Sequence, residues 1–216
     1  IWRIERPMTY TWNDEVIKPQ YVVEKIYEIT NGDAIITTEV GQNQMWAAQF
    51  FKYDRPRTFL SSGGLGTMGY GFPAAIGAQM AFPNKLVIDI AGDGSIQMNI
   101  QELATAVINK LPVKVAIMNN RYLGMVRQWQ ELFYNERYSY SHLDTVPDFV
   151  EVAHAYGAVG LRATKPSEVE PVLKEAFKVK KPVFMDFVID WKEKVYPMVP
   201  AGAPIDHMLF EEPEKK

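Results

Sequence analysis

The sequence contains no cysteine in 216 residues. Disulfides, thiolate metal sites and a cysteine nucleophile are therefore excluded, which fits a reducing compartment. A strong excess of one charge is also missing, since the formal net charge is −3. This mild acidity argues against a nucleic-acid-binding surface, which needs clustered Lys and Arg. No apolar run is long enough for a membrane span, and the first residues lack the pattern of a secretory signal. We expect a cytoplasmic protein that binds neither nucleic acid nor a membrane.

The two ends of the chain differ in composition from its middle. The first residues are irregular and rich in aromatic and polar side chains, and the tail from Val195 is rich in proline. The chain begins Ile1-Trp2-Arg3 without an initiator Met, so we expect it to be part of a longer polypeptide. The expected divisions are an arm over 1–19, a globular domain over 20–192 and a C-terminal arm over 193–216.

Short apolar strands alternate with helical patterns along this domain. Apolar and β-branched runs predict strands at 34–38, 58–62, 86–91, 113–118, 158–162 and 183–189. Apolar residues at helical spacing predict helices at 20–30, 41–52, 69–82, 99–109, 124–134, 147–156 and 167–179. Such alternation predicts an α/β fold, in which a parallel sheet is flanked by helices on both faces.

One expected strand runs directly into Gly92-Asp93-Gly94. In open α/β sheets, ligands bind outside the carboxyl ends of the strands. Glycines at such a place let backbone N–H groups approach a phosphate closely, and the amino end of the following helix adds positive potential. Asp93 supplies an oxygen ligand at the same place. The motif therefore predicts a phosphate-binding turn with a carboxylate at its centre.

The next expected strand also ends in polar residues, Asn119-Asn120, which 24 residues (95–118) separate from Gly94. If the two strands are neighbours, Asp93 and Asn120 converge at one edge of the sheet. Mg²⁺ takes about six oxygen ligands and is commonly completed by substrate phosphates. Either motif alone is more often a plain turn or a helix cap. Because both occur, each after a strand, they favour a metal-diphosphate site.

A second glycine-rich pattern is a weaker signal. Residues 64–69 (GLGTMG) satisfy the G-x-G-x-x-G outline of a dinucleotide fingerprint, and Asp89 lies 20 residues beyond Gly69. Asp89, however, lies inside the strand that leads to Gly92 and not at the end of a separate second strand, so NAD binding is not favoured. Glu39 follows the first strand near the expected site, and we interpret it as a solvated loop residue.

The paired motif is similar to the metal-diphosphate signature of thiamine-diphosphate enzymes. Further segments look like the catalytic subunit of acetohydroxyacid synthase (acetolactate synthase), and the resemblance covers nearly the whole chain. These segments are 40–49 (VGQNQMWAAQ), 64–71 (GLGTMGYG), 124–130 (GMVRQWQ) and 197–200 (PMVP). The resemblance implies that the chain is the C-terminal, thiamine-diphosphate-binding domain of a three-domain subunit.

The resemblance also implies cofactor contacts. Asp93, the side chain of Asn120 and the backbone carbonyl of Tyr122 would bind Mg²⁺. Gln42 and Asn43 would reach the diphosphate; family members usually have His at position 43, and Asn can donate a hydrogen bond but cannot carry charge. The full set of implied contacts is Val40, Gly41, Gln42, Asn43, Gly66, Met68, Gly92, Asp93, Gly94, Ser95, Asn120, Tyr122, Leu123, Gly124 and Met125.

Two groups of residues would shape the rest of the implied site. Gly66 and Met68 would contact the aminopyrimidine, and the adaptable Met side chain would support the bent cofactor. Met125, Val126 and Trp129 would contact the substrates. Met125 and Trp129 are four residues apart and share a helical face, which by spacing alone is more often a core stripe. The resemblance implies that Trp129 lines a pocket for a second 2-keto acid larger than pyruvate.

The implied activity is the condensation of pyruvate with pyruvate or 2-ketobutyrate, with release of CO₂, as the first common step of branched-chain amino acid biosynthesis. The glutamate that activates the cofactor would come from the N-terminal domain of a partner subunit. No catalytic residue is therefore expected in this chain, and the chain alone is expected to be inactive. FAD would bind largely to a middle domain of the full-length protein. The expected assembly is a homodimer or tetramer with active sites between subunits, and a small regulatory subunit is a further candidate partner.

Two alternatives remain open from the sequence. Pyruvate oxidase, 2-keto-acid decarboxylases and glyoxylate carboligase share the metal motif, although the segment 124–130 favours acetohydroxyacid synthase. The chain could also be a non-catalytic assembly module that uses the same fold only to associate with another subunit.

Overall fold

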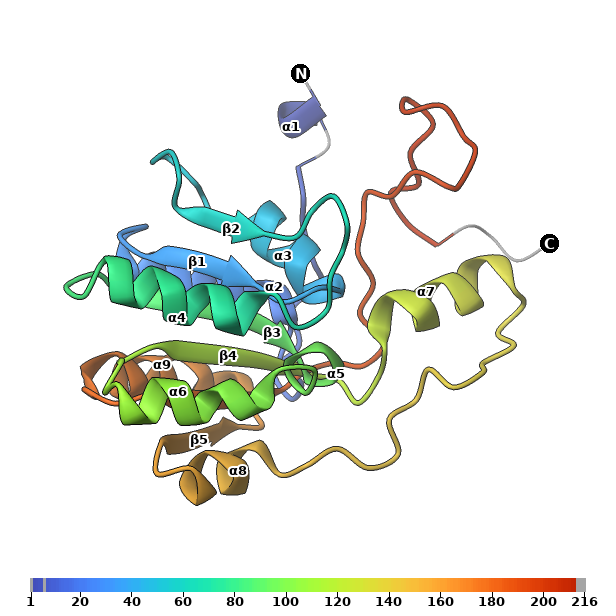
Figure 1. Cartoon of the computed structure of the whole chain (residues 1–216). Helices are drawn as coiled ribbons and strands as arrows, with labels where there is room; N and C mark the ends of the chain where they lie inside the picture. Colours follow the sequence, from blue (N-terminus) through green and yellow to red (C-terminus); the bar gives the residue numbers. More distant parts are fainter. Residues whose placement is uncertain (1, 6, 213–216) are drawn as a thin grey trace.

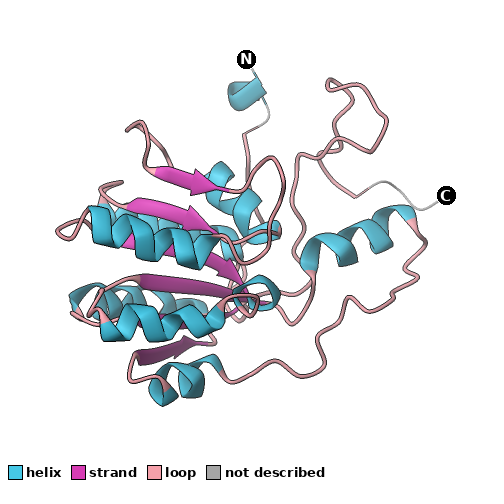
Figure 2. Cartoon of the chain, in the orientation of Figure 1, coloured by secondary structure: helices cyan, strands magenta, loops and turns pink. Residues whose placement is uncertain are grey.

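Within residues 2–5 and 7–212, which this computed structural model describes, six parallel strands form one open sheet in the order β2-β1-β3-β4-β6-β5 (Figures 1 and 2). Their bounds are β1 (Ile35–Thr38), β2 (Phe59–Ser61), β3 (Val87–Gly92), β4 (Lys114–Asn119), β5 (Val159–Ala163) and β6 (Val183–Val188). Every neighbouring pair is parallel. Each strand coincides closely with one predicted from the sequence, so the expected parallel α/β fold is confirmed.

The helices also follow the predicted pattern. Their bounds are α1 (Trp2–Glu5), α2 (Pro19–Thr30), α3 (Gln42–Phe50), α4 (Gly71–Ala81), α5 (Asp93–Ile96), the 3₁₀ turn η1 (Ile100–Glu102), α6 (Leu103–Ile108), α7 (Gly124–Phe133), α8 (Phe149–Ala155) and α9 (Pro166–Lys178). No helix in the described part of the chain is long and apolar enough to cross a bilayer.

Three local details differ from the sequence-based expectation. The arm before α2, expected to be irregular, contains the single turn α1. The helix expected over 99–109 opens as η1 before it becomes α6, because Asn99 is drawn out of helical geometry by its side-chain bond to the carbonyl of Gly69 at 2.7 Å. A further single turn, α5, begins at Asp93 itself, so the backbone leaves β3 already turning.

Helices cover both faces of the sheet because successive strand residues point to opposite sides. On one face, Ile88 and Ile90 of β3 pack in a core with α2, α3 and α9. On the other, Val87 and Ala91 pack in a core with α4, α6 and α8. Figure 1 shows α4 and α6 in front of the sheet, and α2, α3 and α9 behind it. Burial on both faces explains why the central strands β3, β4 and β6 are mostly apolar and show no polar alternation.

The connections leave β1 and β3 toward opposite faces. After β1 the chain enters α3 on one face and continues to β2, whereas after β3 it turns into α5 and reaches α6 on the other face. β1 and β3 are hydrogen-bonded neighbours, with Thr38 opposite Ile90. A crevice is expected outside the carboxyl ends of two strands whose connections diverge in this way.

Gly71 shows how closely this end of the sheet is packed. It is the first residue of α4, and a Cβ added there would overlap the carbonyl carbon of Thr38, the backbone nitrogen of Glu39 and Oδ1 of Asp89. Two of these three atoms belong to the backbone, which cannot rotate away. A residue without a side chain is therefore needed where α4 meets the end of β1.

We expect Gly71→Ala to lower the free energy of unfolding by about 1–3 kcal/mol, because overpacked sites relax only by moving backbone. Gly77→Ala is a matched control on the same helix, since nothing lies within 4 Å of the added Cβ. There, improved helix propensity should raise stability by about 0.5–1 kcal/mol. Urea unfolding of both variants provides the measurement, and equal effects of the two substitutions would contradict the close approach.

Candidate active site

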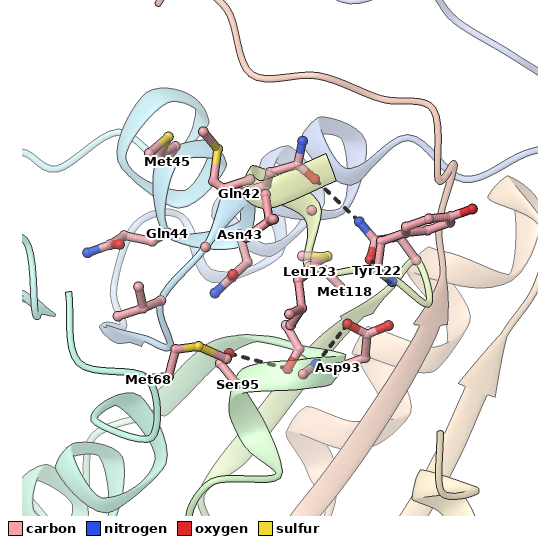
Figure 3. A pocket seen from close by; sticks show the side chains of 18 of the residues that line it. Gln42, Asn43, Gln44, Met45, Met68, Asp93, Ser95, Met118, Tyr122 and Leu123 are labelled. Carbon is pink, nitrogen blue, oxygen red and sulfur yellow. Dashed lines mark hydrogen bonds between the residues drawn. The ribbon is translucent and has the colours of Figure 1, made fainter. Parts of the chain in front are cut away.

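A pocket of about 380 Å³ opens outside the carboxyl ends of the strands. Its walls come from the segments that follow β1, β2, β3 and β4, so residues far apart in sequence meet there. Figure 3 shows Met68 on the opposite side of this pocket from Asp93 and Tyr122. The position agrees with the crevice expected from the divergent connections of β1 and β3.

Every residue named as a cofactor or substrate contact in the sequence analysis lines this pocket. The lining also contains residues that the sequence analysis did not name, namely Gln44, Met45, Trp46 and Met118. Three of these continue the first turns of α3 directly after Gln42 and Asn43, so helical spacing could have indicated them. Met118 precedes Asn119 on β4 and is 2 % exposed. In the sequence it looks like any other apolar residue of a buried strand, so no signal marks it as part of the pocket.

Asp93 is the only charged residue of the pocket lining. Its side chain is 1 % exposed, and its two oxygens accept backbone N–H bonds, from Gly94 at 2.8 Å and from Arg121 at 2.5 Å. Burial raises the pKa of Asp93 to about 7, and the two N–H groups offset part of that effect. Among the described residues, no basic side chain forms an ion pair with it. A buried carboxylate without a cation is costly, so a bound cation would stabilise this site.

The two asparagines at the end of β4, Asn119 in the strand and Asn120 after it, have different roles. Asn119 turns toward β6, where its Nδ2 donates to Asp186 at 2.9 Å. Asn120 faces the pocket, and its Oδ1 accepts the backbone N–H of Tyr122 at 3.0 Å. The loop that carries Asn120 and Tyr122 is fixed to Asp93 through the N–H of Arg121, which has a left-handed φ of 58°.

Tyr122 is held by its ring as well as by its backbone. The ring stacks on Trp191 with centroids 5.4 Å apart and an interplanar angle of 20°, and it lies 4.6 Å from the ring of His142. Residues 121–123 are also bridged to 141–143, since Leu123 donates to Ser141 and Leu143 donates to Arg121. These contacts fix the backbone around the expected carbonyl ligand.

The side chains of Gln42 and Asn43 are engaged with the protein. The Nδ2 of Asn43 donates to the carbonyls of Glu39 at 3.0 Å and Ile90 at 2.8 Å, so its donors are not directed at the pocket. No side chain caps the amino end of α3. The first N–H groups of a helix have no partner within that helix, and here they face the pocket side. The backbone of these residues, and not the amide hydrogens of Asn43, is therefore the donor surface that α3 offers to an anion.

The loop after β2 forms the opposite wall. Gly66 has a φ of 64°, and its N–H donates to Ser62 at 3.0 Å, which shapes the turn that presents Met68. The expectation that Glu39 is a solvated loop residue was wrong, because it is fully buried. Its carboxylate accepts the N–H of Gly69 at 2.6 Å and of Phe72 at 3.0 Å, so it anchors the end of this loop.

Asp89 lies next to Glu39 and is also fully buried. Its Oδ1 accepts the hydroxyl of Thr37 at 3.0 Å, while Oδ2 has no hydrogen-bond partner among the described residues. Burial, and then the nearby Glu39, raise the pKa of Asp89 well above its usual range. Its buried position leaves it unable to hold a ribose, as a dinucleotide fingerprint would require.

Met125, Val126 and Trp129 extend the pocket along α7. Val126 is 41 % exposed and Trp129 is 49 % exposed, and a second hollow of about 260 Å³ continues beside them toward Tyr134 and Arg137. Met125 instead packs partly against the core. The three side chains therefore form an open apolar entrance, in contrast to the closed polar floor around Asp93.

The lining of the pocket fits a diphosphate that brings its own metal. It contains no Lys and no Arg, so an anion could be held only by backbone N–H groups, helix amino ends and a metal ion. The described residues also contain no group of three or more His, Asp or Glu side chains that could hold a metal ion by themselves. One carboxylate, one amide oxygen and one carbonyl would leave Mg²⁺ to complete its shell with phosphate oxygens.

Comparison with known proteins agrees with this geometry. Residues 39–187 match the family model described as the thiamine pyrophosphate enzyme, C-terminal TPP binding domain. The chain belongs to the thiamine pyrophosphate enzymes. The matched range contains the whole pocket lining, so the family's cofactor-binding domain and the pocket are the same part of the molecule.

The resemblance to acetolactate synthase is also confirmed. The chain is 48 % identical to the acetolactate synthase isozyme 3 large subunit of Escherichia coli over 99 % of its length. It is 45 % identical to the acetolactate synthase large subunit of Haemophilus influenzae over its full length, and 49 % identical to an acetolactate synthase of Mycobacterium bovis over 94 %. It spans 38 %, 38 % and 34 % of these three relatives.

The buried carboxyls predict a pH dependence of stability. Raised folded-state pKa values mean that the folded chain binds more protons than the unfolded chain above about pH 4, so the cofactor-free chain should lose stability as pH rises toward 8. Asp89→Asn imitates the protonated carboxyl. We expect this variant to match the wild type near pH 5 and to exceed it by about 1–3 kcal/mol near pH 8. Urea unfolding across this range tests it, and a constant difference would argue against a protonated Asp89.

Proposed function

We propose that this chain is the cofactor-binding part of an acetolactate synthase large subunit. The observation that carries the proposal is the uncompensated carboxylate of Asp93 in the floor of a pocket without basic residues, fixed through the N–H of Arg121 to the loop that carries Asn120. When bound there, thiamine diphosphate supplies the carbanion chemistry that joins two 2-keto acids with release of CO₂. The chain supplies the positions of the cofactor and of the metal.

Each wall of the pocket has a separate task in this proposal. Asp93, Asn120 and the carbonyl of Tyr122 hold Mg²⁺, and the amino ends of α3 and α5 hold the diphosphate. Gly66 and Met68 support the aminopyrimidine from the opposite side. Val40, Leu123 and Gly124 line the pocket between these ends.

The open entrance on α7 is proposed to receive the substrates. Met125, Val126 and Trp129 give it an apolar lining that is exposed enough to admit a small molecule. The exposed indole of Trp129 offers a flat surface to a second 2-keto acid larger than pyruvate, which favours a biosynthetic over a catabolic acetolactate synthase.

The remaining parts of the proposal concern the whole protein. We infer the domain division of 1–19, 20–192 and 193–216, which is supported by the start of α2 at Pro19 and by the irregular backbone after β6. FAD, a homodimer or tetramer with sites between subunits, a small regulatory subunit and a cytoplasmic location belong to the same proposal. It is supported by the names of the relatives, which include large subunits.

Binding of thiamine diphosphate with Mg²⁺ to the purified chain is the direct test. We expect saturable binding by calorimetry, and at least a tenfold loss on Asp93→Ala because the only carboxylate ligand is removed. Asp89→Asn is the matched control, since it alters a buried carboxyl on β3, the strand that leads to Asp93, and lies outside the pocket lining. Equal loss in both variants, or no binding by the wild type, would contradict the proposed site.

The same chain should not form acetolactate from pyruvate by itself. No glutamate lines the pocket, and Glu39, which lies nearby, is engaged in holding the loop before α4. A carboxylate that activates the cofactor must therefore come from another part of the enzyme. A colorimetric assay for acetolactate with saturating cofactor measures this, and clear turnover by the 216-residue chain would refute it.

A further inference from the structure

Three buried side-chain amides form a continuous connection from the C-terminal segment to the expected metal ligand. They belong to Gln128 on α7, Gln42 on α3 and Asn120 after β4, and they are 0 %, 3 % and 7 % exposed. An amide has a donor end and an acceptor end of nearly the same size, so packing alone cannot choose between its two orientations. Hydrogen bonds must make that choice.

The orientation of Gln128 is set by the backbone of Val195. Its Oε1 accepts the N–H of Val195 at 2.8 Å, and its Nε2 donates to the carbonyl of Val195 at 2.9 Å. A backbone N–H can only donate and a carbonyl can only accept. Reversing the Gln128 amide would place its Nε2 against the N–H of Val195, which are both donors. It would also place its Oε1 against the carbonyl of Val195, which are both acceptors. Such contacts inside the protein are strongly unfavourable.

Gln42 receives its orientation from Gln128. Its Nε2 donates to Oε1 of Gln128 at 2.9 Å and to the backbone carbonyl of Glu193 at 3.1 Å. Both partners accept only, so the amide nitrogen of Gln42 must point toward α7 and the C-terminal segment. Its Oε1 consequently points the other way, toward Asn120.

Asn120 is the last member of the connection. Its Nδ2 donates to Oε1 of Gln42 at 3.3 Å, so its Oδ1, which accepts the N–H of Tyr122, points away from Gln42. Asn120 itself lines the pocket. Gly124 leaves the space that this arrangement needs, because a Cβ there would overlap Oε1 of Gln42 and approach Nδ2 of Asn120. Figure 3 shows the bond from Gln42 crossing from α3 toward the segment that carries Tyr122.

We propose that Gln128 is a positioning residue that acts through Gln42 to hold the Asn120 amide with its oxygen, and not its nitrogen, toward the metal of the bound cofactor. The inference rests on the proposed function, since it needs Asn120 to be a metal ligand. It assigns to Gln128, which does not line the pocket, an effect on metal affinity.

The test uses the 216-residue chain, saturating thiamine diphosphate and Mn²⁺, whose free form is counted by electron paramagnetic resonance. Gln128→Met keeps the side-chain volume but removes the donor and the strong acceptor. We expect Mn²⁺ to bind about tenfold to a hundredfold more weakly, as when partners that orient metal ligands are removed. Gln79→Met is the matched control, because Gln79 is also buried and its Nε2 also donates to two backbone carbonyls, but on α4. Its Mn²⁺ affinity should equal that of the wild type.

A second background separates positioning from a general loss of structure. In an Asn120→Asp background, both side-chain atoms that could face the metal are oxygens, and the one that replaces Nδ2 meets the acceptor Oε1 of Gln42. Gln128→Met frees Gln42 to turn its Nε2 toward that oxygen, so it should leave Mn²⁺ binding unchanged or strengthen it. Independent structural damage would instead weaken Mn²⁺ binding equally in both backgrounds.

The outcomes distinguish this inference from the proposed function. A wild-type chain that binds no Mn²⁺ with thiamine diphosphate overturns the proposed function and the inference together. If the wild type binds and Gln128→Met costs no more than Gln79→Met, or costs the same in the Asn120→Asp background, the proposed function stands and the inference is overturned. A tenfold loss that disappears in the Asn120→Asp background supports it.

Discussion

The site depends on one unfavourable feature, the burial of the Asp93 carboxylate without a cation from the protein. Its two backbone N–H partners orient it but carry only partial charges. A Lys or Arg at this place would stabilise the chain alone and would fill the position that a metal needs. The uncompensated charge makes the chain less stable than it would be with a cation beside Asp93, so binding of the cation and diphosphate of the proposed function would stabilise the fold. The rest of the pocket is consistent with this, because it offers helix ends and glycines to the anion and no positive side chain.

Parallel strands explain how such a site is assembled from distant residues. Because all strands run the same way, the segments that follow β1, β2, β3 and β4 emerge at one edge of the sheet. The connections after β1 and β3 then leave toward opposite faces, which opens a crevice between them. Deeply packed anchors keep its walls in place: Glu39 holds the end of the Met68 loop, and Asn99 holds the carbonyl of Gly69. The wall that carries Met68 is therefore anchored by buried hydrogen bonds, while α7 provides a more exposed wall.

Much of this could be predicted from the sequence because the signals are local. Strand and helix positions follow from apolar periodicity, and Gly92-Asp93-Gly94 with Asn119-Asn120 marks two strand ends. What could not be predicted depends on which direction a side chain takes. Glu39 was expected in solvent but turns inward to three backbone N–H groups at the start of α4. Asn119 and Asn120 look alike in sequence, yet only Asn120 faces the pocket, since strand pleating and the turn at Arg121 send its neighbour toward Asp186. The hydrogen bonds of Gln128 could not be predicted from a local motif, because its partners lie on α3 and in the C-terminal segment.

Neutral amides suit the connection between that segment and Asn120 better than charged groups would. A cation at Gln42 or Gln128 would compensate Asp93 and compete with the metal, while a carboxylate would add a second buried negative charge. A side-chain amide has no net charge, yet its orientation is defined, because its oxygen accepts and its nitrogen donates. The backbone of Val195, whose donor and acceptor cannot be exchanged, orients the amide of Gln128. Gln128 in turn orients the amide of Gln42. The orientation of the Asn120 amide can thus be fixed from outside the pocket without altering the charge of Asp93, to which the proposed function assigns the metal.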